Sequence, residues 1–141
     1  MDVIDKEILA LLRANGRMPV KEIASRVSLT SPAVSERIHR LERLGIIAGY
    51  TVLERRSQSK TQVDALVNIS VPTGDRRQFL DLIESRTEVT QCFHVTGSYS
   101  YMVRVCCPDM QGLENLINTL QKLGQTSTQI ILSTPIDRPL G

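Results

Sequence analysis

The sequence predicts an α+β protein in two parts: an N-terminal winged helix-turn-helix domain, then a ferredoxin-like domain with the element order βαββαβ. Apolar residues between positions 2 and 44 recur at the three-to-four spacing of short helices. From position 63 onward, apolar and polar residues alternate as they do in strands. Residues 1–60 hold eleven Lys and Arg against seven Asp and Glu, whereas residues 61–141 hold six against eight. The basic first part favours a nucleic-acid surface there.

Two helices are expected before residue 28. The first runs from Asp2, a suitable N-cap, to Ala14, and Asn15-Gly16 ends it. The second begins near Pro19, which fits the first turn of a helix. Their buried faces are expected to hold Ile4, Ile8, Leu11 and Leu12 in the first and Val20, Ile23, Ala24 and Val27 in the second.

A short polar break over residues 28–31 leads into a third helix. Thr30 or Ser31 can cap this helix, and Gly45 ends it. The break holds Ser28 where many such turns hold Gly, a mild departure because Ser tolerates turns. The buried stripe of the third helix is Val34, Ile38, Leu41 and Leu44. Three short helices with a tight break between the last two predict a helix-turn-helix.

The segment after the third helix is predicted to be a wing and a linker. Residues 46–53 are mostly apolar and indicate a short strand or wing. Residues 54–60 are polar and basic without a period, which indicates a linker or the far edge of the wing. The predicted domains are therefore 1–60 and 61–141.

The second part is predicted to form one antiparallel sheet with both helices on one face. Along residues 99–107, Tyr101, Val103 and Val105 share one face of the strand. Met102, Arg104 and Cys106 share the other. Strands are expected over 63–71, 89–96, 99–107 and 127–134, with helices over 75–86 and 110–123.

Composition argues against several other classes of protein. No apolar run approaches the roughly 18 residues of a membrane helix, and the acidic start lacks the features of a secretory signal. A soluble, cytoplasmic protein without membrane contact is expected. Three cysteines without paired spacing argue against a disulfide framework. The two histidines lie far apart, so no metal site and no cofactor are expected.

No arrangement of residues typical of a catalytic site stands out, and no enzyme is expected. Cys92 and His94 lie two apart along one predicted strand and would share a face. Packing is favoured over a catalytic Cys/His pair. Because ferredoxin-like domains also host catalysis, an activated Cys92 thiol would be the sign of an enzyme instead.

Several motifs along the chain carry a resemblance to a known family. Their order and spacing, more than any one motif, are similar to the Lrp/AsnC family of feast/famine, amino-acid-responsive regulators. The recognition helix and wing entry of that family resemble residues 29–47, with Glu36-Arg37 and Arg40-Leu41-Glu42-x-x-Gly45-Ile46-Ile47. The other matching motifs are Asp5-x-x-Ile8-Leu9, Asn15-Gly16-Arg17 and Val95-Thr96-Gly97-x-Tyr99-x-Tyr101.

The third helix is expected to enter the major groove of DNA while flanking basic residues hold phosphates. Small side chains near its start allow close approach, and long donors follow. The predicted contacts are Ser31, Ala33, Ser35, Arg37, His39 and Arg40, with Arg55, Arg56 and Lys60 beyond the helix. As an alternative, Glu36 and Arg37 form a solvated face, or Arg37 pairs internally with an acid such as Glu7 or Glu22.

The resemblance also implies a ligand site and an assembly. Family members pack as dimers through their sheets and often form larger rings, with an effector held near the Gly97 turn. By this resemblance, Gly97, Ser98, Tyr99 and Ser100 line one side of the site, and Thr126 and Thr128 line the other. Many members carry Asp where this chain has Ser100, which implies weaker recognition of an amino group or a different ligand.

The expected function is therefore a sequence-specific, DNA-binding transcription regulator, controlled by a small-molecule effector such as an amino acid. Its expected partners are double-stranded DNA and further copies of itself, as a homodimer, tetramer or octamer. The alternative is an architectural protein that compacts DNA without responding to an effector.

Overall fold

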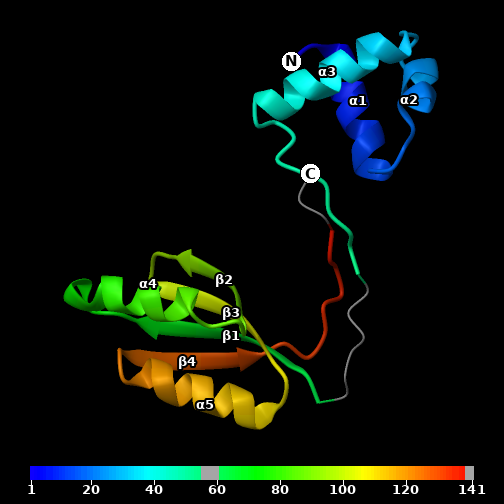
Figure 1. The fold of residues 1–141 in the computed structure, drawn as a ribbon. Coiled ribbons are helices and arrows are strands. Elements are labelled where there is room, and N and C mark those ends of the chain that lie inside the picture. The colour runs from blue at the N-terminus through cyan, green and yellow to red at the C-terminus, as the bar shows by residue number, and fades with distance from the viewer. Residues whose placement is uncertain (55–60, 139–141) are drawn as a thin grey trace. The chain divides into compact units, whose positions relative to one another are not determined.

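The structure is a computed structural model that describes residues 1–54 and 61–138. The described residues fall into two compact units, one within residues 1–54 and the other within residues 61–138 (Figure 1). The predicted boundary after residue 60 lies between these two ranges and stays a prediction. No helix among the described residues is long and apolar enough to span a membrane.

The first unit contains the three predicted helices: α1 (Val3–Ala14), α2 (Val20–Arg26) and α3 (Ser31–Arg43). Asp2 caps α1 in a reciprocal pair with Asp5, and the Thr30 hydroxyl accepts a hydrogen bond from the Ala33 amide at the start of α3. Apolar side chains from the three helices bury one core, made of Ile8, Ile23, Ala24, Val27, Val34 and Ile38. The prediction of three helices is confirmed, but Leu44, which was expected in the buried stripe of the third helix, is exposed because α3 ends at Arg43.

The break between α2 and α3 has a left-handed residue. Ser28 has a φ of 56°, a conformation that favours glycine because a Cβ is crowded there. The amide of Leu29 donates to the carbonyl of Ala24 and closes the turn. Ser28 therefore holds a tight helix-turn-helix break at a conformational cost.

The predicted wing strand is wrong for the described part of this segment. Residues 46–54 contain no strand. Val52 and Leu53 are about four-fifths exposed, so their apolar side chains have no sheet to bury them. The amides of Ile46 and Ile47 instead donate to the Leu41 carbonyl and close the end of α3.

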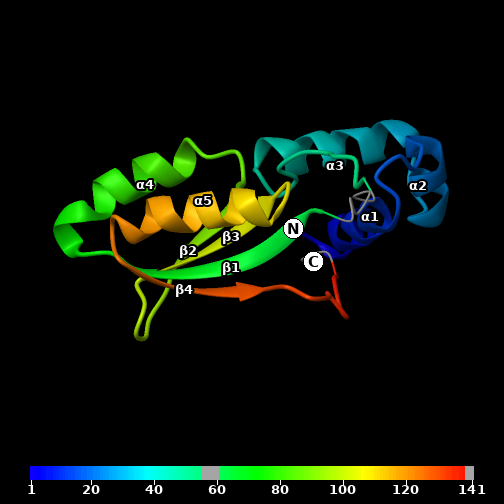
Figure 2. The ribbon, with the colours of Figure 1, turned by 90° about the horizontal axis from the view of Figure 1, so that it is seen from below.

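The second unit is one antiparallel sheet with the strand order β2-β3-β1-β4. Helices α4 and α5 lie on the same face of the sheet (Figure 2). This arrangement confirms the predicted fold of the second part. The strands are β1 (Val63–Ser70), β2 (Val89–His94), β3 (Tyr101–Cys107) and β4 (Gln125–Ile130), and the helices are α4 (Arg76–Glu84) and α5 (Met110–Gln121).

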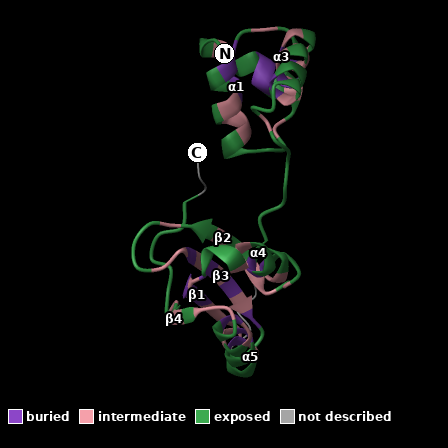
Figure 3. Ribbon diagram, turned by 90° about the vertical axis from the view of Figure 1, so that its left-hand side faces the viewer, coloured by how far each residue is buried: buried purple, intermediate pink, exposed green. Residues whose placement is uncertain are grey.

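The core of this unit lies between the sheet and the two helices, where the buried residues gather in Figure 3. Along β3, Tyr101, Val103, Val105 and Cys107 are buried, whereas the residues between them are only half-buried. The helices therefore cover the face that holds Tyr101. The opposite face, with Met102 and the exposed Phe93, stays open in one chain.

The last strand lies earlier in the sequence than predicted. It begins at Gln125 rather than residue 127 and ends at Ile130, which pairs with Ala65 near the start of β1. Just beyond β4, the Ile131 amide donates to the Asp64 carbonyl. Because β1 begins at Val63, almost none of it remains to pair with residues 132–134. Just before β4, a Cβ at Gly124 would lie 1.8 Å from the Ser70 carbonyl oxygen, so only glycine allows this approach.

Candidate functional site

A buried carboxylate joins the first helix to the third. Asp5 has no exposed surface, and its oxygens accept hydrogen bonds from Arg37 at 2.8 Å and from Arg40 at 2.8 and 3.0 Å. Arg37 also donates to Asp2 at 2.6 Å. The side chains of Arg37 and Arg40 are 23% and 46% exposed, so Arg40 keeps more contact with solvent. Two of the predicted DNA contacts thus take part in ion pairs within the unit.

The arginines of this network favour the charged forms of its two carboxylates. Burial alone would raise the pKa of Asp5, but the hydrogen bonds from the Asp2 amide and Arg37 and the charge of Arg40 lower it. The Arg37 hydrogen bond also lowers the pKa of Asp2, and the two carboxylates raise the pKa of Arg37. Asp2, Asp5 and Arg37 therefore stay charged at neutral pH. The internal pairing considered for Arg37 is present, with Asp2 and Asp5 rather than Glu7 or Glu22.

The exposed face of α3 lies opposite its buried stripe. Glu36, His39 and Arg43 follow one another at helical spacing, and Arg43 donates to Glu36 at 3.1 Å. His39 is 65% exposed and lies 3.2 Å from Glu42. The Tyr50 hydroxyl donates to the same Glu42, at 2.9 Å. This face carries donors and acceptors that could reach base edges.

The remaining predicted DNA contacts divide between this face and its flanks. Ser31, Ala33 and Ser35 are half-buried and lie in the first turns of α3. Arg43 was not predicted as a DNA contact, although its position four residues after His39 places both side chains on one face of a helix. Arg55 and Arg56, with Lys60, lie outside the described residues.

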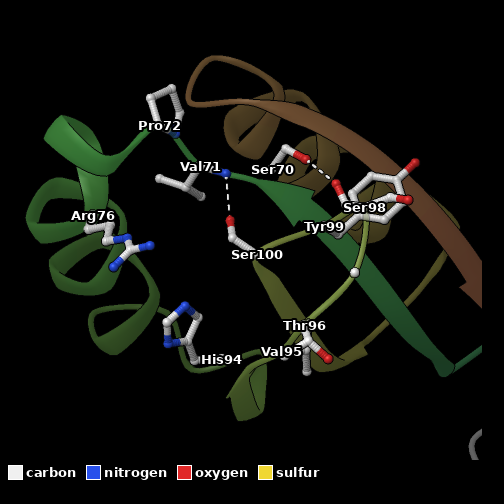
Figure 4. Close-up of a pocket in the computed structure, with 11 residues that line it drawn as sticks. Ser70, Val71, Pro72, Arg76, His94, Val95, Thr96, Ser98, Tyr99 and Ser100 are labelled. Carbon is white, nitrogen blue, oxygen red and sulfur yellow. Dashed lines mark hydrogen bonds between the residues drawn. The ribbon is translucent and has the colours of Figure 1, made fainter.

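A pocket of about 470 Å³ lies at the turn between β2 and β3. The end of β1 contributes residues 70–72, α4 contributes Arg76, and β2 contributes His94 (Figure 4). The turn itself contributes residues 95–100, which include the predicted Gly97, Ser98, Tyr99 and Ser100. Pockets that hold small molecules commonly have volumes of about 300–1,000 Å³. The four predicted turn residues therefore meet in a cavity of suitable size.

Hydrogen bonds hold the turn against the end of β1. The Ser70 hydroxyl donates to the Ser98 carbonyl at 3.0 Å, and the Ser100 hydroxyl accepts from the Val71 amide at 2.8 Å. The Ser100 hydroxyl also donates to the Ile69 carbonyl at 3.3 Å. Gly97 has a φ of 108°, which other residues rarely adopt. The shape of the pocket wall therefore depends on Gly97 and Ser100.

Two cationic or potentially cationic side chains line the pocket and were missed in the sequence. The guanidinium of Arg76 and the ring of His94 point toward a common space in Figure 4. His94 stacks on Tyr101 at 4.8 Å, and Tyr101 in turn lies 4.7 Å from Phe79 of α4. Arg76 and His94 are 18 positions apart on different elements, so no local pattern could have linked them.

Thr126 and Thr128 do not line this pocket. They lie on β4 opposite Ile69 and Val67, and the Gln121 amide donates to the Thr126 hydroxyl at 3.3 Å. Within one chain, the structure does not bring these two threonines to the turn residues with which they were predicted to act.

Cys92 and Cys107 do not have the features of activated thiols. Cys92 is half-buried, and burial raises the pKa of its thiol. Burial also raises the pKa of the Cys107 thiol. A raised pKa reduces the thiolate fraction at neutral pH, and the thiolate is the reactive form. Across residues 1–54 and 61–138, no group of three or more His, Cys, Asp or Glu side chains gathers as a metal site.

Two family models match the chain. The AsnC-type helix-turn-helix domain matches residues 1–42, and the Lrp/AsnC ligand binding domain matches residues 64–140. The leucine-responsive regulatory protein of Escherichia coli (strain K12) is 31% identical, over 94% of this chain and 85% of its own length. The HTH-type transcriptional regulator LrpC of Bacillus subtilis (strain 168) is 28% identical, over 94% of this chain and 92% of its own.

Solved structures agree with these matches. The structure of E. coli AsnC has a TM-score of 0.90 and 29% sequence identity, covering 99% of this chain and 97% of that one. A feast or famine regulatory protein from M. tuberculosis, complexed with L-methionine, has a TM-score of 0.82 and 29% identity over the same shares. The chain belongs to the Lrp/AsnC family of helix-turn-helix transcription regulators.

Proposed function

We propose that this protein regulates transcription by binding duplex DNA at defined sequences and changing that binding in response to a small molecule. The exposed polar face of α3 carries the proposal, because it presents His39 and Arg43 on a helix that the first unit packs rigidly on its core. Helices at this place in helix-turn-helix proteins enter the major groove and read base edges. Chromosomal DNA is in the cytoplasm of a prokaryote, where such a regulator acts.

The residues of α3 divide into two roles in this proposal. Ser31, Ala33, Ser35 and His39 approach the bases, and Arg43 joins them from the exposed face. Arg40, about half exposed, holds Asp5 and reaches a phosphate at the same time. Arg37 is more buried and pairs with two acids, so it orients α3 rather than reading a base. Arg55 and Arg56 are proposed phosphate contacts on the strength of their charge alone.

The effector is proposed to bind in the pocket at the β2–β3 turn, against Gly97, Ser98, Tyr99 and Ser100. The similar M. tuberculosis protein is complexed with L-methionine, which supports an amino acid as the effector. In one chain Thr126 and Thr128 lie away from this pocket. Their proposed part in binding therefore requires a second protomer.

A homodimer is proposed to form through the open face of the sheet, and larger rings to form from dimers. That face presents the exposed Phe93 and the half-buried Met102 and Leu66, which one chain leaves uncovered. Large apolar side chains on an open sheet face favour association, because burying them removes apolar surface from water. A two-fold dimer also places two recognition helices on one DNA duplex.

In vitro selection with full-length protein tests the proposed function. The protein is mixed with a library of duplexes that carry a random central region, and bound duplexes are amplified and sequenced over several rounds. We expect one sequence, with approximate two-fold symmetry, to become enriched. If no sequence is enriched while duplexes bind with an affinity set by salt alone, the protein is an architectural DNA-compacting protein instead.

A further inference from the structure

The pocket at the β2–β3 turn has a cationic end. Arg76 stands at the first position of α4, and its Nε is buried without a hydrogen-bond partner among the described residues. A guanidinium stays charged at all ordinary pH values and presents a planar set of donors that matches a carboxylate. The His94 ring lines the same pocket and can donate a hydrogen bond in its neutral or its protonated form. An anionic group placed between them would accept hydrogen bonds from the guanidinium and the imidazole.

The pocket offers little to an ammonium group. Among the described residues that line it there is no carboxylate. The Ser100 hydroxyl already makes two hydrogen bonds to the backbone, at Val71 and Ile69. The carbonyls of Ser98 and Ser100 accept hydrogen bonds from the Ser70 hydroxyl and the Val95 amide. An ammonium group would therefore meet a nearby guanidinium and, among the described lining residues of this chain, only neutral acceptors.

We propose that this pocket recognises its effector by the carboxylate, held by Arg76 and His94, and that the amino group contributes nothing to affinity. The inference rests on the proposed function, since it takes the turn as the effector site. It extends the ligand class from amino acids to small carboxylic acids without an amino group, such as 2-oxo acids. Arg76 and His94 become binding residues of that site.

Isothermal titration of the full-length protein tests this with three matched probes: L-methionine, its 2-oxo analogue 4-methylthio-2-oxobutanoate, and L-methioninamide. The same three forms of leucine are titrated in parallel. We expect the 2-oxo acid to bind as tightly as the amino acid or more tightly, and the amide, which lacks the carboxylate, to bind at least tenfold more weakly. An inorganic phosphate titration separates recognition of carboxylates from recognition of any anion.

Two variants and a matched control test which pocket residues determine ligand preference. Arg76→Gln should raise the Kd of the 2-oxo acid at least tenfold, whereas the matched control Arg77→Gln should leave it unchanged, because Arg77 is 93% exposed on the same helix. Ser100→Asp adds a carboxylate to the pocket and should shift the preference at least tenfold toward the amino acid. Far-ultraviolet circular dichroism spectra and thermal unfolding of each variant, compared with those of the unaltered protein, verify that the fold is kept.

Three results would overturn the inference. The first is a 2-oxo acid that binds tenfold more weakly than its amino acid, and the second is an Arg76→Gln variant that binds as the unaltered protein does. The third is a protein that binds inorganic phosphate as well as it binds the carboxylic acids, or that binds none of the probes. Affinity of the same preparations for duplex DNA is measured separately, so that loss of the ligand assignment and loss of the DNA-binding function are distinguishable.

Discussion

The carboxylate of Asp5 accepts a hydrogen bond from Arg37 at 2.8 Å, across 32 positions of the sequence. Asp5 belongs to α1 and Arg37 to α3, so this contact fixes the recognition helix against the first helix. Among the described residues, the donors that offset the loss of hydration of this buried acid are the two arginines and the Asp2 amide. The proposed DNA-reading face of α3 consequently depends on a buried residue of α1.

Asp5→Asn should destabilise the first unit. The substitution keeps the shape of the side chain but leaves Arg37 and Arg40 without their buried anion, at a cost of about 2–3 kcal/mol. Urea unfolding of the full-length protein measures the change in the free energy of unfolding. Glu7→Gln, on the exposed side of α1, is the control and should have little effect. Equal stability of Asp5→Asn and the unaltered protein would show that the network is incidental.

The same network predicts a dependence on acid pH. The pKa of Asp5 is lowered from 3.8 in the folded protein, so its contribution is fully present above that value. The contribution is lost as the pH falls below 3.8 and through the folded pKa. The protection factors of peptides from α1 and α3 in hydrogen–deuterium exchange, which correct for the slower intrinsic exchange at acid pH, should fall in this range, and less so in Asp5→Asn. Identical acid profiles in the two proteins would contradict the account.

His39→Ala should weaken binding to a selected DNA site by about 1–3 kcal/mol and leave binding to random duplex unchanged, if His39 reads a base. Fluorescence anisotropy with both duplexes measures the difference. Arg13→Ala, on α1, removes a charge away from the reading face and is the control for general electrostatic effects. Equal weakening on both duplexes would assign His39 to phosphate instead.

Ser28→Gly should stabilise the helix-turn-helix. Ser28 has a φ of 56°, and glycine adopts this conformation without crowding a Cβ. After allowance for the greater freedom of glycine in the unfolded chain, the gain should be about 0.5–1 kcal/mol. Thermal unfolding monitored by circular dichroism at 222 nm checks the direction. A lower Tm would mean that the Ser28 side chain makes a favourable contact that outweighs the strain.

Gly97→Val should abolish the effector response or disrupt higher assembly without changing DNA binding by the first unit. Its φ of 108° is unsuited to a β-branched residue, so the turn must change shape although there is open space at this position. Titration calorimetry with L-methionine and sedimentation velocity measure the two effects. Unchanged assembly together with an unchanged response would remove Gly97 from the ligand site.

Local periodicity was sufficient to predict both halves of the fold. Ile8 and Val34 recur with their neighbours at helical spacing, and Tyr101 to Cys107 alternates as a half-covered strand. The prediction of a wing strand was wrong because an apolar run such as Val52-Leu53 indicates a strand only when another strand is available to pair with it.

The candidate sites were predicted less completely, because their contacts are made between distant elements. Asp5 has a clear local reason for its position near the start of a helix, so nothing in the sequence revealed that it also holds two arginines of α3. The Gly97 turn was found from its motif, whereas Arg76 comes to it only through the packing of α4 on the sheet. Tertiary structure was needed to bring these residues together.

The central claim is sequence-specific DNA binding, and the ratio of two affinities tests it most directly. The Kd of the full-length protein is measured at physiological salt for the selected duplex and for a shuffled duplex of equal length and composition. The account predicts that the selected duplex binds at least about a thousandfold more tightly, the lower end of the range for specific regulators. Equal affinity for the two duplexes, falling in parallel as salt is raised, would contradict it.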